Sequence, residues 1–164
     1  MKVNPLHSYI TVWLEKIGMK KPDRPSLMTP EQKKMNMMLI DEEVQELMND
    51  DIVELCDAYF DVLWVVTQSA MMNGININDI VRAGAASNLS KFCDTHEEAI
   101  QTVTAYMNGT HPNKQGVFIE TRIEEVNGSY VIKRTKDSKV LKSISFREPD
   151  FSFIENRMKK PEAV

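Results

Sequence analysis

Residues 51–66 read DIVELCDAYFDVLWVV, and this stretch decides the fold. Asp51 can cap a helix, and Glu54 three residues later completes a capping box. Glu54, Asp57 and Asp61 then follow an i, i+3, i+7 spacing, which places them within an arc of about 60°. Nearly every other position is apolar. A helix that is apolar around most of its circumference belongs inside a helical bundle.

A second acidic arc precedes this stretch. Glu43 and Glu46 are three residues apart and project from one side of a helix that starts with the capping box of Thr29 and Gln32. A turn at 49–51 is so short that the two helices must form an antiparallel pair. The pair brings the two arcs within reach of each other. Converging carboxylates repel, raise one another's pKa values and suit Mg²⁺ or Mn²⁺. A solvated acidic face is the alternative.

Capping and stop signals predict further helices, and the tail has a different pattern. The helices are expected at about 5–17, 29–48, 51–73, 78–91 and 95–109. Asn127-Gly128 between two β-branched runs predicts a hairpin, with two or three antiparallel strands in the tail. The expected fold is therefore mainly α, an antiparallel helical bundle with a small C-terminal β appendage. We expect residues 1–92 to form a helical catalytic core and residues 93–164 to form an extension packed on it, within a single domain.

Composition narrows the classes of function. The chain has 164 residues and a net charge of −4, which disfavours a nucleic-acid partner. The two cysteines lack the spacing of a zinc site or a disulfide scaffold. The richest apolar stretch is too short and too polar to span a bilayer, and the first residues have no signal-peptide core. We therefore expect a cytoplasmic protein without a membrane or nucleic-acid partner.

Several motifs, taken in order, resemble one enzyme superfamily. The motifs are Glu42-Glu43-x-x-Glu46, Glu54-x-x-Asp57, the following apolar helix, Ser87-Asn88-Leu89-Ser90-Lys91, Lys139-Val140-Leu141-Lys142-Ser143 and Pro149-Asp150. Together they are similar to the all-α nucleoside triphosphate pyrophosphohydrolases, which include MazG-like enzymes, dimeric dUTPases and phosphoribosyl-ATP pyrophosphohydrolases. The resemblance covers about residues 7–154 and favours the phosphoribosyl-ATP-pyrophosphohydrolase-like branch.

The resemblance implies roles for individual residues. The positions that match the family's Mg²⁺ ligands are Glu43, Glu46, Glu54 and Asp57. Glu42 matches the residue that activates water, and Asp61 matches an acid that binds metal or orients a ligand. Asn88 and Lys91 match groups that contact the nucleotide's phosphates and sugar, although a lysine in the last turn is also an ordinary partner of the helix dipole.

The chain departs from the family pattern at one spacing. Only seven residues separate Glu46 from Glu54, and the family's usual interval is longer by about one helical turn. If the hairpin is shortened unevenly on its two arms, Glu54 is the doubtful ligand.

The implied function is Mg²⁺-dependent cleavage of a nucleotide between its α- and β-phosphates, with Mn²⁺ as a substitute ion, in a homodimer or homotetramer. Two rivals stay open at this stage. One is a dimeric dUTPase-like enzyme that acts on di- and triphosphates. The other is a non-catalytic helical interaction protein that docks a basic partner on its acidic face.

Overall fold

The computed structural model describes residues 5–159, which form two compact units. One unit consists of the residues up to Val81 together with those from Phe151 on, and the other runs from Arg82 to Asp150. The mainly helical fold with a small antiparallel sheet is confirmed. The packing of the C-terminal extension on a helical core stays a prediction.

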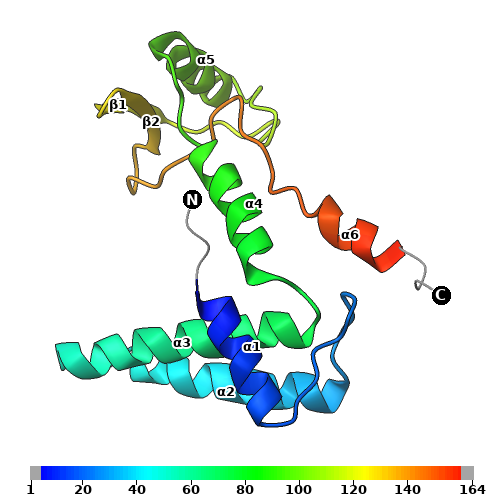
Figure 1. Ribbon diagram of the computed structural model, residues 1–164. Coiled ribbons are helices and arrows are strands. Elements are labelled where there is room, and N and C mark those ends of the chain that lie inside the picture. The colour runs from blue at the N-terminus through cyan, green and yellow to red at the C-terminus, as the bar shows by residue number, and fades with distance from the viewer. Residues whose placement is uncertain (1–4, 160–164) are drawn as a thin grey trace. The chain divides into compact units, whose positions relative to one another are not determined.

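The first unit is built on a helical hairpin. Helix α2 (Pro30–Glu46) and helix α3 (Ile52–Met72) lie side by side, and α1 (Leu6–Lys16) packs against α3 (Figure 1). The predicted capping box of α2 forms: the Thr29 hydroxyl accepts the Gln32 amide while the Gln32 side chain accepts the Thr29 amide. At α3 the Asp51 side chain caps the helix, but the predicted box with Glu54 does not close, because the Asp51 amide donates to the Asn49 side chain. The core of this unit gathers the buried side chains of Leu6, Ile10, Leu14 and Met71.

The end of α3 is fixed by a glycine and a loop. Gly74 has φ +69°, and a Cβ there would stand 2.3 Å from the carbonyl oxygen of Arg24. The loop that crosses it is fastened by hydrogen bonds from the Ser26 amide to the Asn73 carbonyl and from the Met28 amide to the Asn73 side chain. Only glycine combines this backbone conformation with so close an approach.

Much of α3 is exposed within the single chain, contrary to the expectation of a helix inside a bundle. Packing by α1 and α2 leaves several large apolar side chains of α3 open to solvent, namely Ile52, Val53, Tyr59, Phe60, Leu63 and Val66. Helix α2 is more open still, since Asn36 is its one buried side chain. The apolar surface of α3 is therefore larger than the area that α1 and α2 bury.

The second unit packs one helix on a hairpin. Helix α4 (Ile77–Leu89) crosses the boundary between the units, and α5 (His96–Met107) packs on strands β1 (Thr121–Val126) and β2 (Ser129–Arg134). Asn127 and Gly128 both adopt positive φ, as a two-residue hairpin turn requires. The core of the second unit is Cys93, Ala99, Tyr106, Ile132 and Leu141.

Within residues 93–159 the tail forms two strands, which is the lower of the two expected numbers. Val140 makes an isolated bridge to Lys133, and the Leu141 amide donates to the Ile132 carbonyl. The chain then leaves the sheet, because the Ser143 hydroxyl donates to the Ser90 carbonyl and the Ile144 amide donates to the Thr102 hydroxyl. A further helix, α6 (Ser152–Lys159), was not expected from the sequence pattern.

Candidate functional site

The helical hairpin brings three carboxylates together. Glu43 and Glu46 extend from α2 and Asp61 from α3, and one carboxylate oxygen of each lies within 4.8 Å of the other two. Glu43 and Asp61 are half-buried and Glu46 is exposed. The i, i+3 spacing on α2 puts its two glutamates on one side, and the antiparallel pairing turns that side toward α3. We call Glu43, Glu46 and Asp61 the carboxylate group.

Electrostatic repulsion marks the centre of this group. The pKa of Glu43 is raised, first by burial and then by the negative charge of Asp61, with further contributions from Glu46, Glu42 and Asp57. Among the ion pairs recorded for residues 5–159, none involves any of these five acids. The group therefore carries several negative charges and no side-chain counter-ion in this part of the chain.

Two of the predicted ligands lie outside the carboxylate group. Glu54 sits in the first turn of α3, where its amide donates to the Asp51 cap, and it lines a separate hollow of about 420 Å³ beside Glu46. Asp57 is exposed and acts on Glu43 only through its charge. The short turn between the helices sets a register in which Asp61, rather than Glu54 or Asp57, meets the α2 glutamates.

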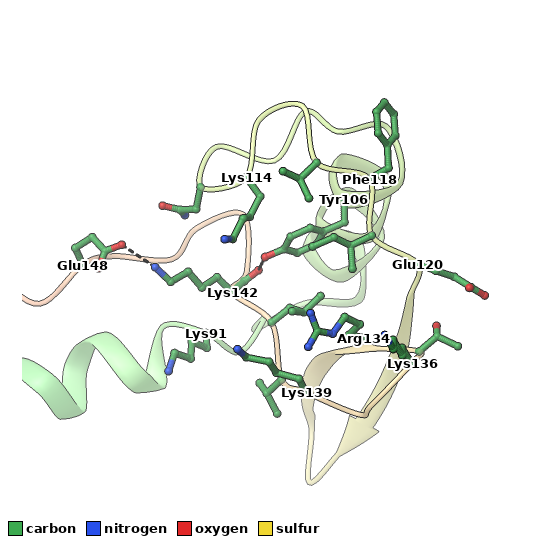
Figure 2. A pocket seen from close by; sticks show the side chains of 16 residues that line it. Lys91, Tyr106, Lys114, Phe118, Glu120, Arg134, Lys136, Lys139, Lys142 and Glu148 are labelled. Carbon is green, nitrogen blue, oxygen red and sulfur yellow. Dashed lines mark hydrogen bonds and ion pairs between the residues drawn. The ribbon is translucent and has the colours of Figure 1, made fainter.

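The predicted phosphate-contacting residues lie in the second unit. The Lys91 ammonium donates to the Asn88 side-chain oxygen at 2.6 Å, so the last turn of α4 and the residues just after it hold the two as a pair. Lys91 also lines a pocket of about 930 Å³ in the same unit (Figure 2). Sequence analysis missed Lys114 and Tyr106, which line this pocket too. Neither belongs to a motif, and the loop that carries Lys114 has no regular period that would have revealed it.

The helices of the structure were also compared with the length and apolarity of a membrane-spanning helix. Between residues 5 and 159 the structure has no helix with the length and apolarity that crossing a bilayer requires.

Comparison with known proteins agrees with the motifs. The phosphoribosyl-ATP pyrophosphohydrolase family model matches residues 14–88, a segment that contains every acidic candidate and Asn88 but ends before Lys91. The uncharacterised protein L479 of Acanthamoeba polyphaga mimivirus is 30% identical over 93 residues, which is 57% of this chain and 36% of that protein. The chain thus spans little more than a third of this relative's length. Residues 14–88 thus match the phosphoribosyl-ATP pyrophosphohydrolase family, which is part of the all-α nucleoside triphosphate pyrophosphohydrolase superfamily.

Proposed function

We propose that the chain hydrolyses a nucleoside triphosphate or a related nucleotide between its α- and β-phosphates, giving a monophosphate and pyrophosphate. The observation that carries this proposal is the carboxylate group on the matched helical segment. A hydrolase of this kind must bring anionic phosphates to an anionic protein surface, and such a surface can do so only with a cation.

The donor set fits a hard divalent cation. Glu43, Glu46 and Asp61 offer three carboxylate oxygens within 4.8 Å of one another. The pKa of Glu43 is raised by burial and then by the charges of its acidic neighbours, and a cation would relieve that repulsion. Oxygen ligands of this type suit Mg²⁺, with Mn²⁺ as a substitute. When bound, the ion would neutralise negative charge on the substrate's phosphates. We assign the ligand roles to these three residues, with Glu54 and Asp57 as flanking acids.

The remaining residues take the roles that the resemblance implies. Glu42, exposed beside Glu43, accepts a proton from the attacking water. Lys91 holds a phosphate oxygen as a point charge, and Asn88 donates its amide to the sugar or to a phosphate. The Lys91–Asn88 hydrogen bond supports a shared task, because it orients the amide oxygen toward the ammonium and leaves the amide hydrogens free to donate.

A panel of nucleotides tests the proposal. The chain is incubated with each NTP, dNTP and nucleoside diphosphate in Mg²⁺, and monophosphate, pyrophosphate and phosphate are quantified. Release of pyrophosphate from triphosphates is the expected result, and turnover of diphosphates would instead favour the dUTPase-like rival. Glu43→Gln and Asp61→Asn should each lower the rate at least about a hundredfold. Glu31→Gln, an exposed acid in the first turn of α2, is the matched control. If the two site variants turn over substrate as fast as the control does, the assignment is refuted.

We also propose that the chain works as a homodimer or homotetramer. The support is the set of exposed apolar side chains on α2 and α3, which includes Met35, Met37 and Met38 on one helix and Tyr59, Phe60 and Leu63 on the other. Exposed apolar side chains in this number on two neighbouring helices are typical of an interface. Light scattering at micromolar concentration should give a mass at least twice the 18.8 kDa of the chain, and a monodisperse monomer would contradict this.

A further inference from the structure

The second unit contains a pocket whose charge is opposite to that of the carboxylate group. It has a volume of about 930 Å³, and all its lining residues lie between Lys91 and Glu148. The amino groups of Lys114 and Lys142 approach the same open space as those of Lys91 and Lys139 (Figure 2). A volume of this size accommodates a nucleotide-sized ligand. We call it the cationic pocket.

Positive charge is concentrated in this pocket beyond what the composition of the unit explains. Residues 82–150 carry ten basic and nine acidic side chains, so the unit is close to neutral. Two of the acids line the pocket, Glu120 and Glu148, against six of the basic residues: Lys91, Lys114, Arg134, Lys136, Lys139 and Lys142. Clefts lined by one sign of charge focus the field and attract ions of the other sign.

Internal partners neutralise only part of this charge. Asp137 pairs with Arg134, and Glu148 accepts a hydrogen bond from the Lys142 ammonium at 2.7 Å. No ion pair is recorded for Lys114, Lys136 or Lys139 anywhere in residues 5–159. These three ammonium groups are exposed, and among the described residues only Lys139 has a recorded electrostatic interaction, with Asp137, so most of their charge is available to a ligand.

The backbone that carries these lysines is held in place. The turn before Lys139 is closed by hydrogen bonds from the Ser138 amide to the Arg134 carbonyl and from the Arg134 amide to the Lys139 carbonyl. The Lys114 amide donates to the carbonyl of His111, a buried ring stacked on Tyr106 with centroids 4.0 Å apart. Cations on fixed turns bind an anion with less loss of conformational entropy than cations on a mobile loop.

One wall of the pocket is apolar. The Tyr106 ring is buried, and its hydroxyl donates to the Lys142 carbonyl at 3.1 Å. Phe118 is 74% exposed, and the far edge of its ring lies beside Gly109. An exposed aromatic ring among the lining residues can stack on a planar ring that carries a phosphate chain.

We infer that the cationic pocket binds an oligophosphate, either the phosphate chain of a nucleotide or a free inorganic oligophosphate, and that it does so without a divalent metal. A single carboxylate or phosphate would leave several of the ammonium groups unmatched, whereas a chain of two or three phosphates meets them together. A long nucleic acid fits less well, because the pocket is a local hollow on a chain with a net charge of −4. The inference shares Lys91 with the proposed hydrolysis and otherwise goes beyond it, because no member of the carboxylate group lines the pocket.

Calorimetric titration of the full chain with inorganic tripolyphosphate in EDTA tests the inference. Saturable binding with one site per chain is expected. A Lys114→Gln, Lys139→Gln double variant should bind at least tenfold more weakly, while a Lys33→Gln, Lys34→Gln variant on exposed α2 positions should bind like the wild type. All four lysines are exposed, so native circular dichroism is expected of both variants. No saturable binding, or equal weakening in both variants, would overturn the inference.

Two further arms separate this inference from the proposed hydrolysis. Glu43→Gln should leave tripolyphosphate binding in EDTA unchanged, and a loss of binding in this variant would overturn the pocket assignment. If the chain binds tripolyphosphate but hydrolyses no nucleotide, the pocket stands and the proposed hydrolysis fails. Tighter binding of a nucleoside triphosphate that is lost in Phe118→Ala identifies a nucleotide as the ligand. Equal affinity for both compounds identifies the phosphate chain alone.

Discussion

Replacing Asp61 by asparagine should change the thermal stability of the protein in opposite directions with and without Mg²⁺. The substitution keeps the shape of the side chain and removes one charge from the carboxylate group, whose oxygens lie within 4.8 Å of one another. In EDTA the group is three anions that repel, so Asp61→Asn should melt above the wild type. In Mg²⁺ the same change removes a ligand, so the variant should melt below the wild type.

The size of each effect follows from the geometry. At 4.8 Å, two unit charges repel by about 1 kcal/mol in a medium as polarisable as water. Asp61 takes part in two such pairs, so relief of about 2 kcal/mol is expected before screening, and salt reduces it because Glu46 is exposed. For a protein of this size each 1 kcal/mol shifts Tm by about 2–4 °C. Mg²⁺ at a hundredfold excess over Kd stabilises the wild type by about 2.7 kcal/mol.

The assay is a pair of thermal scans at matched ionic strength, one in EDTA and one in Mg²⁺. Glu54→Gln is the informative comparison, because Glu54 lies outside the carboxylate group in the first turn of α3. A carboxylate at that position interacts favourably with the helix dipole, so the loss of its charge should lower Tm by a similar small amount in both buffers. A crossover for Asp61→Asn with parallel shifts for Glu54→Gln supports the ligand assignment. Parallel shifts for both variants would refute it.

Three further outcomes are expected. Gly74→Ala should lower the free energy of unfolding in urea by at least about 2 kcal/mol, because the added Cβ would clash with a loop carbonyl. Gly18 has a similar φ but open space around it, so Gly18→Ala should lower that free energy only by the backbone strain of about 1 kcal/mol. Arg134 lowers the pKa of Asp137 to about 2, so the stability that Asp137→Asn loses near neutral pH should vanish as the pH falls through that value. The raised pKa of Glu43 implies stability that declines as pH rises above its ordinary value of 4.5, so in EDTA the wild type should lose stability relative to Glu43→Gln over that range, as measured by Tm against pH.

The helix boundaries were predictable because their signals are local. Thr29 and Gln32 form a capping box wherever the rest of the chain goes, and the Asp51 side chain accepts the amides of Val53 and Glu54 within its own turn. The Asn127-Gly128 hairpin has the same property, since the turn type depends on two residues. Helix α6 also had a local signal, Ser-x-x-Glu at 152–155, which marks a helix start to within a residue or two.

The register of α3 against α2 was not predictable from the spacing of acids. An i, i+3, i+7 row on α3 offers Glu54, Asp57 and Asp61 equally, and the turn between the helices decides which of them meets Glu43. The cationic pocket could not be predicted from the sequence for a similar reason. Its basic residues were visible in the tail, but Lys114 enters from an irregular loop, and only the folded chain places it with Lys139.

The two clusters of charge depend on different contacts, and this makes their roles separable. The carboxylate group rests on the pairing of α2 with α3, whereas the cationic pocket rests on α5, the loop after it and the turn that follows β2. Because they share no residue, the effects of Asp61→Asn and Lys114→Gln on unfolding should add to within about 0.5 kcal/mol when no ligand is present. The same double-mutant cycle run on nucleotide affinity in Mg²⁺ measures whether one ligand couples them, and a departure from additivity would show such coupling. Additive affinities would mean that the two clusters bind separate molecules, with the cationic pocket then outside the hydrolytic reaction.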